Sequence, residues 1–89
     1  MITSYQMRAA RALLGIDQKT LAELSGVSLP TIQRMEASAG NVRGIVDSLT
    51  KVVDAFNRSG VELIVDNARS DAGGRGVRLK QPGPPRAGA

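Results

Sequence analysis

The 89-residue sequence contains no cysteine, no histidine and no tryptophan, and it has only one tyrosine and one phenylalanine. Without cysteine or histidine, the chain cannot form disulfides, the usual zinc sites, cysteine nucleophiles or a histidine-based catalytic triad. Its eight carboxylates are scattered singly along the sequence, which argues against a metal site built from oxygen ligands. We therefore expect that the protein is not an enzyme and needs no cofactor.

Long apolar runs are also missing. No stretch of about 18 consecutive apolar residues is present, so the sequence predicts no membrane-spanning helix. The N-terminus has no charged segment followed by an apolar one, as a secretory signal would, and we expect a cytoplasmic protein. Hydrophobic residues make up 42% of the chain and charged residues 22%. Most of this short chain should therefore fold, as one domain at most.

The positive net charge is unevenly distributed. The whole chain carries a formal charge of +4, and residues 67–89 account for all of it, since residues 1–36 carry +1 and residues 37–66 carry −1. The net charge is therefore only a weak argument for a nucleic-acid partner.

Residues 15–36 carry the most informative pattern. Asp17 is a good helix N-cap, and Gly26 can adopt the left-handed conformation that ends a helix. Ser28 can cap a second helix, with Pro30 in its first turn, where a missing N–H costs little. The pattern predicts two short helices joined at a sharp angle by a turn at Gly26; two ordinary helices of a small bundle are the alternative. The residues expected to pack inward are Leu21, Ala22, Leu24, Ile32 and Met35.

This run resembles the helix-turn-helix of the XRE family, the Cro/cI-type regulators of phages and bacteria. The matching residues are Gly15-Ile16-x-Gln18-x-x-Leu21-Ala22 and Gly26-Val27-Ser28-x-x-Thr31-Ile32-x-x-Met35-Glu36, preceded by Arg11. The resemblance covers about residues 3–56 and implies a lambda-repressor-like domain that binds a roughly palindromic operator as a homodimer. Met35 is a mild departure in the core. Leu29 and Pro30 stand where relatives often carry polar residues that read bases.

The expected fold is mostly α, a four- to five-helix lambda-repressor-like DNA-binding domain with a C-terminal β-hairpin and a disordered tail. The helix-turn-helix domain is expected over residues 1–59, the hairpin over 60–80 and the tail over 81–89. A first helix should run from a cap at Thr3 or Ser4 to about Leu14. A longer helix should begin near Asn41 and stop at Gly60. Its apolar stripe is Val42, Ile45, Val46, Leu49, Val52, Val53 and Phe56.

Beyond Gly60 the apolar residues alternate, which is typical of strands. An isolated hairpin is marginal in water, so this one should pack on the long helix or pair with a second chain. We favour the second interpretation, in which the hairpin is a dimerisation element. Its interface residues would be Val61, Leu63, Ile64, Val65, Val77 and Leu79. Part of the long helix could face the second subunit instead, or complete the core of its own chain.

Specific roles follow for the helix that begins at Ser28. Arg34 and Gln33 are expected to read base edges in the major groove, Arg34 at guanine and Gln33 at adenine unless it is merely solvated. Leu29 and Thr31 could touch thymine methyls or the backbone.

Further roles concern the phosphate backbone and the packing of the domain. Gln18 and Lys19 should meet phosphates at the start of the first helix of the motif. The family resemblance adds phosphate contacts for Arg43 and Ser28. It also implies a structural ion pair between Arg11 and Glu36; a solvated Arg11 is the alternative.

The expected function is that of a sequence-specific transcriptional regulator of double-stranded DNA, most simply a repressor that blocks polymerase. An activator that touches RNA polymerase, an antitoxin that binds its own promoter and a cognate toxin, and an interaction module without DNA contact are the alternatives. The protein would be cytoplasmic, and nucleoid-associated when bound to DNA.

Overall fold

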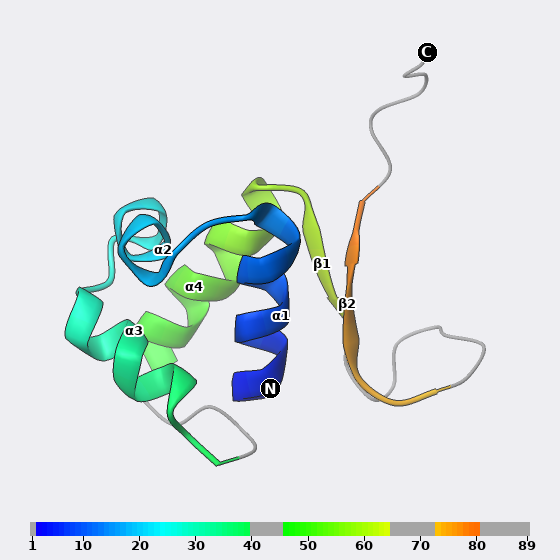
Figure 1. Cartoon of the computed structure of the whole chain (residues 1–89), viewed down its shortest axis with the longest axis horizontal. Coiled ribbons are helices and arrows are strands. Elements are labelled where there is room, and N and C mark those ends of the chain that lie inside the picture. Colours follow the sequence, from blue (N-terminus) through cyan, green and yellow to red (C-terminus); the bar gives the residue numbers. More distant parts are fainter. Residues whose placement is uncertain (1, 40–45, 65–72, 81–89) are drawn as a thin grey trace.

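A computed structural model describes residues 2–39, 46–64 and 73–80 of the chain. In this part of the chain, four helices are followed by a two-stranded antiparallel sheet (Figure 1). The elements are α1 Ser4–Leu14, α2 Gln18–Ser25, α3 Leu29–Glu36, α4 Val46–Arg58, β1 Val61–Ile64 and β2 Gly76–Leu79. The predicted mostly helical fold with a C-terminal hairpin is confirmed. The expected helix start at Asn41, the site residues Arg43 and Val65, and the tail at 81–89 lie outside the described residues.

Helix α1 begins with a capping box. The hydroxyl of Thr3 accepts a hydrogen bond from the backbone N–H of Gln6 at 3.1 Å, and the Gln6 side-chain oxygen accepts one from the Thr3 N–H at 2.9 Å. Both bonds satisfy donors that the start of a helix leaves without an intrahelical partner. The helix ends at Gly15 in the left-handed conformation. The predicted bounds of the first helix agree with this.

The turn between α2 and α3 has the local structure that its residues predict. Asp17 caps α2 by accepting from the N–H of Thr20 at 2.8 Å, and Ser28 caps α3 by accepting from the N–H of Thr31 at 3.3 Å. Between them, Gly26 has a φ of 72°, which most residues with a Cβ would adopt only with strain. The sharp bend of the motif therefore depends on a glycine at this position.

One of the inward-facing predictions for α2 is wrong. Leu21 is fully buried and Ala22 is half-buried, as expected, but Leu24 remains 41% exposed. Helix geometry explains the difference: Ser25, four positions after Leu21, lies about 40° from it around the axis, whereas Leu24 lies about 60° away on the other side. The buried face runs through Leu21 and Ser25, so Leu24 points to its exposed margin.

The core draws on all four helices and the first strand. Its fully buried large side chains come from residues that are far apart in the sequence, so the helix-turn-helix depends on α1, α4 and β1 to cover it. These side chains are Met7, Leu21, Ile32, Met35, Val52, Phe56 and Val61.

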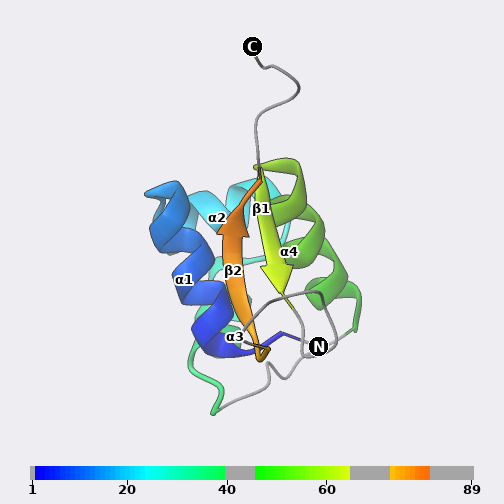
Figure 2. The same cartoon turned by 90° about the vertical axis from the view of Figure 1, so that its right-hand side faces the viewer.

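The two strands lie side by side across the helices. Val61 pairs with Leu79 and Ile64 with Gly76 in the antiparallel register. Figure 2 shows the hairpin in front, between α1 and α4, with α3 behind it. The hairpin therefore packs on its own chain, the first of the two arrangements expected from its alternating sequence.

A buried glutamine fastens the hairpin to α1. Gln6 is 4% exposed, and its Nε2 donates to the carbonyl oxygens of Ile64 and Gly76, each at 2.9 Å. One amide group thus bonds both strands at the same end of the hairpin while its oxygen completes the cap of α1. The same side chain therefore fixes both the start of α1 and one end of the hairpin.

This packing changes the prediction for the dimer interface. Val61 is fully buried within its own chain, so its side chain is not on the surface and that part of the predicted interface is corrected. Leu63, Ile64 and Val77 are half-buried and Leu79 is 53% exposed. The remaining hairpin surface is mixed rather than a continuous apolar face.

The apolar stripe of α4 is covered unevenly. Val52 and Phe56 are fully buried, Leu49 and Val53 are half-buried, and Val46 is 76% exposed. The C-terminal half of the helix therefore completes the core, while its first turns present apolar surface to solvent. Among the described residues, no helix has both the length and the hydrophobicity needed to cross a bilayer.

Replacing Gln6 by leucine is expected to lower the free energy of unfolding by about 2–4 kcal/mol, because two strand carbonyls lose their buried donor. Urea denaturation followed by circular dichroism measures the change. The control is Thr3→Ala, which removes the capping hydroxyl at about 1 kcal/mol but keeps both amide bonds. If both variants lower the free energy of unfolding by the same amount, the hairpin does not depend on the Gln6 amide.

Candidate nucleic-acid interface

Helix α3 lies at the edge of the molecule opposite the hairpin (Figure 1). Ile32 and Met35 anchor its inner face, with exposures of 0% and 1%. The other side of the helix carries Gln33 and Arg34, both exposed. A helix that is fixed on one face and exposed on the other can be inserted into the major groove, which is wide enough to admit it.

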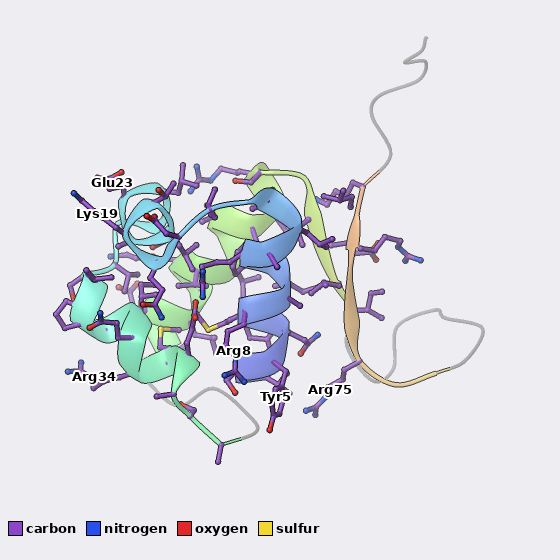
Figure 3. All side chains as sticks on the ribbon, in the orientation of Figure 1. Tyr5, Arg8, Lys19, Glu23, Arg34 and Arg75 are labelled. Carbon is purple, nitrogen blue, oxygen red and sulfur yellow. The ribbon has the colours of Figure 1, made fainter. Side chains whose placement is uncertain are left out.

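The side chain of Arg34 extends from α3 into solvent (Figure 3). Its Nη2 donates to the hydroxyl of Thr31 at 3.3 Å, and that hydroxyl also accepts from the Ser28 hydroxyl at 2.9 Å. The single long bond orients the guanidinium along the helix and leaves most of its donors for a ligand. The planar fork of these donors matches the O6 and N7 acceptors of guanine.

The first turn of α3 is less polar than its middle. Leu29 and Thr31 are half-buried and Pro30 is exposed. The Ser28 hydroxyl is already used as the N-cap and as the donor to Thr31. This turn therefore offers methyl and methylene groups, which suit contact with thymine methyls or sugars better than hydrogen bonding to base edges.

At the start of α2, the two predicted phosphate contacts differ in availability. Lys19 is exposed and extends outward beside Glu23 (Figure 3). Gln18 is half-buried, and its Nε2 donates to Glu36 Oε1 at 3.1 Å. The Gln18 side chain is thus engaged within the protein. Its backbone N–H, in the first turn of α2 and without an intrahelical partner, is the group positioned for a phosphate.

The cap of α2 is electrostatically favourable. The hydrogen bond from the Thr20 N–H holds the pKa of Asp17 below its usual value of 3.8. A carboxylate whose pKa is lowered by folding stabilises the fold above its usual pKa, and this contribution is lost as the pH falls through the lowered value. Near neutral pH the cap is fully ionised.

The packing of α3 is fixed by an ion pair with α1. Arg11 Nε lies 2.7 Å from Glu36 Oε2, and Arg11 Nη2 lies 2.8 Å from Oε1. Arg11 Nη1 also donates to the carbonyl of Ile16 at 3.2 Å. The Glu36 side chain is 3% exposed and that of Arg11 21%. The pair implied by the family resemblance is therefore formed, with two parallel bonds and little access to water.

This pair joins three helices. Glu36 ends α3, Arg11 belongs to α1, and Gln18 at the start of α2 bonds the same carboxylate. The hydrogen bond with Glu36 raises the pKa of Arg11, against the opposite effect of partial burial. Since both hydrogen-bond geometry and charge favour one arrangement, the network sets the orientation of α3 relative to α2.

A sequence model described as helix-turn-helix matches residues 7–63, more than half of the chain. The chain belongs to the XRE family of Cro/cI-type helix-turn-helix proteins. No curated protein matches the sequence significantly. The family match shows a DNA-binding transcription regulator, from a family that is generally not enzymatic.

The XRE match extends from α1 into β1 and thus includes the strand that buries Val61. Arg43, expected to contact the backbone, lies outside the described residues. Among residues 2–39, 46–64 and 73–80, no three carboxylates are close enough together to hold a metal ion.

Besides the Gln6 bonds to the hairpin, two features of this XRE domain escaped the sequence analysis. The Gln18 amide is part of the Arg11–Glu36 network. Nothing in the sequence distinguishes Gln18 from an ordinary polar residue at the start of a helix, so this contact could not be predicted. Arg8 stacks over the ring of Tyr5, 5.0 Å from its centroid. Their i, i+3 spacing on α1 could have indicated this second contact.

Replacing Arg11 by methionine should lower the free energy of unfolding by about 3–5 kcal/mol, because the buried Glu36 carboxylate loses its cation. Denaturant unfolding measures this. The double variant Arg11→Met/Glu36→Gln is the control: it removes the stranded charge and should cost less than the sum of the single changes. Additive costs would show that the two side chains do not interact.

Proposed function

We propose that the protein is a transcriptional repressor that binds a palindromic operator as a homodimer, with one α3 in each half-site. The observation that carries the proposal is the exposed Gln33–Arg34 face on a helix held by the buried Arg11–Glu36 pair. A base-reading helix must keep its orientation while its side chains approach base edges, and this pair supplies that constraint.

Sequence would be read mainly by Arg34. Its guanidinium donates to guanine O6 and N7, while the amide of Gln33 can pair with adenine. Leu29 and Thr31 contribute apolar contacts at the start of α3, which favour thymine through its methyl group. Because these contacts are few, part of the specificity would come from the shape and deformability of the operator.

Phosphate contacts would position the domain without reading sequence. Lys19 supplies a mobile positive charge, and the N-terminal N–H groups of α2, including that of Gln18, supply fixed donors. Ser28 and Arg43 are further contacts proposed on the family pattern. These groups lie before and after α3 in the chain and would hold the backbone on either side of the groove.

The homodimer would form through the flank of α4 and β1. An apolar groove lies between these elements, lined by Ile2, Val46, Leu49, Val53 and Leu63 among others. Covering it with the same groove of a second copy would remove exposed apolar surface from water. Val46, which is 76% exposed, would gain most from this burial.

The position of this groove suits a two-fold operator. α4 lies at one side of the hairpin and α3 lies behind it (Figure 2). A two-fold axis beside α4, running from the hairpin side towards α3, leaves both α3 helices on the same face of the dimer. Two such helices should contact half-sites about 34 Å apart, one turn of DNA. Bound over a promoter, the dimer would exclude polymerase.

The base-reading role of Arg34 predicts a loss of about 1–3 kcal/mol of operator binding in Arg34→Ala, with relaxed preference at one base position. Lys19→Ala should weaken binding to all duplexes similarly and reduce the salt slope by about one unit. The operator is obtained by selection from random duplexes, and affinities are measured by fluorescence anisotropy. If Arg34→Ala behaved like Lys19→Ala, Arg34 would not read bases.

Repression is tested with a reporter whose promoter contains the selected operator. Expression of the protein should lower the reporter signal, and Arg34→Ala should restore it. An increase in the signal would contradict repression and support activation.

The dimer surface predicts that Val46→Glu yields a folded monomer with weakened operator binding, because a charge on the groove prevents its burial. Light scattering gives the mass and circular dichroism confirms the fold. Leu79→Lys, at an exposed position of the hairpin, is the control and should remain dimeric. The reverse result would favour dimerisation through the hairpin, and a wild-type monomer would contradict the homodimer altogether.

A further inference from the structure

One face of α1 lies beside the C-terminal end of α3. Tyr5, Arg8 and Arg11 follow one another at intervals of three, so they share a side of the helix. At one end of this row, Arg11 holds Glu36, the last residue of α3. At the other end, the hydroxyl of Ser4 donates to the carbonyl of Ser38 at 2.7 Å, just after α3. Arg8 lies between these two contacts and therefore next to the base-reading helix.

Arg8 is oriented without being neutralised. Its guanidinium stacks on the ring of Tyr5, 5.0 Å from the centroid, and Tyr5 is itself 65% exposed. Among the residues that the structure describes, no carboxylate forms an ion pair with Arg8. A cation–π contact limits the motion of the side chain but leaves the positive charge and the N–H donors at the edge of the guanidinium for an anion.

In the described part of the chain, the one carboxylate beside this face of α1 is that of Glu36, which is already paired with Arg11. Neither α1 nor β2 contains an acidic residue. The exposed carboxylates of the described elements lie on α2, α4 and β1 or cap α2: Asp17, Glu23, Asp47, Asp54 and Glu62. Figure 3 shows Arg34 on α3 and Arg8 on α1 along the same margin of the molecule. The positive charge of Arg8 therefore lies on the same side of the molecule as the predicted base reader, Arg34.

We propose that Tyr5 and Arg8 form a second phosphate-binding site on α1, which contacts the DNA backbone beside the bases that α3 reads. The ligand is a phosphodiester of the duplex. The Arg8 guanidinium donates to its anionic oxygens, and the Tyr5 hydroxyl supplies a further donor. This inference rests on the placement of α3 in the major groove under the proposed function.

The site adds affinity that is independent of base sequence. A phosphate contact releases condensed counterions, so its contribution appears in the salt dependence of binding. It also explains the exposure of Tyr5, a large aromatic side chain whose ring keeps Arg8 in place while its hydroxyl faces solvent.

The test uses the full chain, the selected operator and a random duplex of equal length. Arg8→Ala should weaken binding to both duplexes by about five- to tenfold at physiological salt and lower the salt slope by about 0.9. Tyr5→Phe keeps the stacking and should retain the slope with a smaller loss of affinity, whereas Tyr5→Ala should resemble Arg8→Ala. Circular dichroism checks that each variant is folded.

The matched control is Arg58→Ala, which changes the net charge equally. Arg58 is exposed on α4 and pairs with Asp54 at 2.7 Å, so its removal should leave the slope unchanged. If Arg8→Ala and Arg58→Ala have the same slope, Arg8 makes no phosphate contact and the proposal is overturned.

Phosphate ethylation interference locates the contact. The wild type should show one interfering phosphate that disappears in Arg8→Ala while the others remain. An unchanged pattern would contradict the proposal. Failure of the base-reading model would give a different result. In that case the Arg34→Ala variant would keep the sequence preference of the wild type, whatever the effect of Arg8→Ala.

Discussion

The buried pair of Arg11 and Glu36 is the constraint on which the rest of the interface depends. A carboxylate at the C-terminal end of a helix is opposed by the helix dipole, and Glu36 is also removed from water. Arg11 and the Gln18 amide compensate for both costs through short hydrogen bonds. Since these partners belong to α1 and α2, the carboxylate is satisfied only when all three helices are correctly placed. The exposed face of α3 is thereby presented in one orientation.

The molecule separates its surfaces by chemistry. The outer face of α3 and the adjoining face of α1 carry arginines, whereas the flank of α4 and β1 combines apolar side chains with the carboxylates of Asp54 and Glu62. A polyanion is attracted to the first surface, whereas the carboxylates of the second are paired with Arg58 and Arg78 and leave little net charge there. In the proposed homodimer, the apolar flank is the surface that a second copy of the chain would cover. DNA binding and the proposed self-association would therefore use separate surfaces.

The hairpin completes the helical domain. Val61 fills the core between helices, and the Gln6 amide holds both strands by their carbonyl groups. The alternating pattern predicted that the two strands pair, but not which elements pack against them. Alternation identifies an apolar face without identifying what packs on it. In the tertiary structure, α1 and α4 pack against the hairpin. The hairpin, which the sequence predicted as a dimerisation element, therefore also packs against the helices that support α3.

Local sequence determined the caps at Thr3, Asp17 and Ser28, the left-handed turn at Gly26 and the bounds of the first three helices, because each depends on backbone groups only a few residues away. The four candidate base-reading residues, Leu29, Thr31, Gln33 and Arg34, followed from the same pattern. Only the tertiary structure decided that Gln6 bonds strands 58 and 70 positions further along the chain. It also decided that Gln18 is engaged with Glu36, that Leu24 is exposed and that Arg8 lies beside the end of α3. These outcomes depend on how the helices and strands pack against one another, and the periodicity within a single helix does not predict that packing.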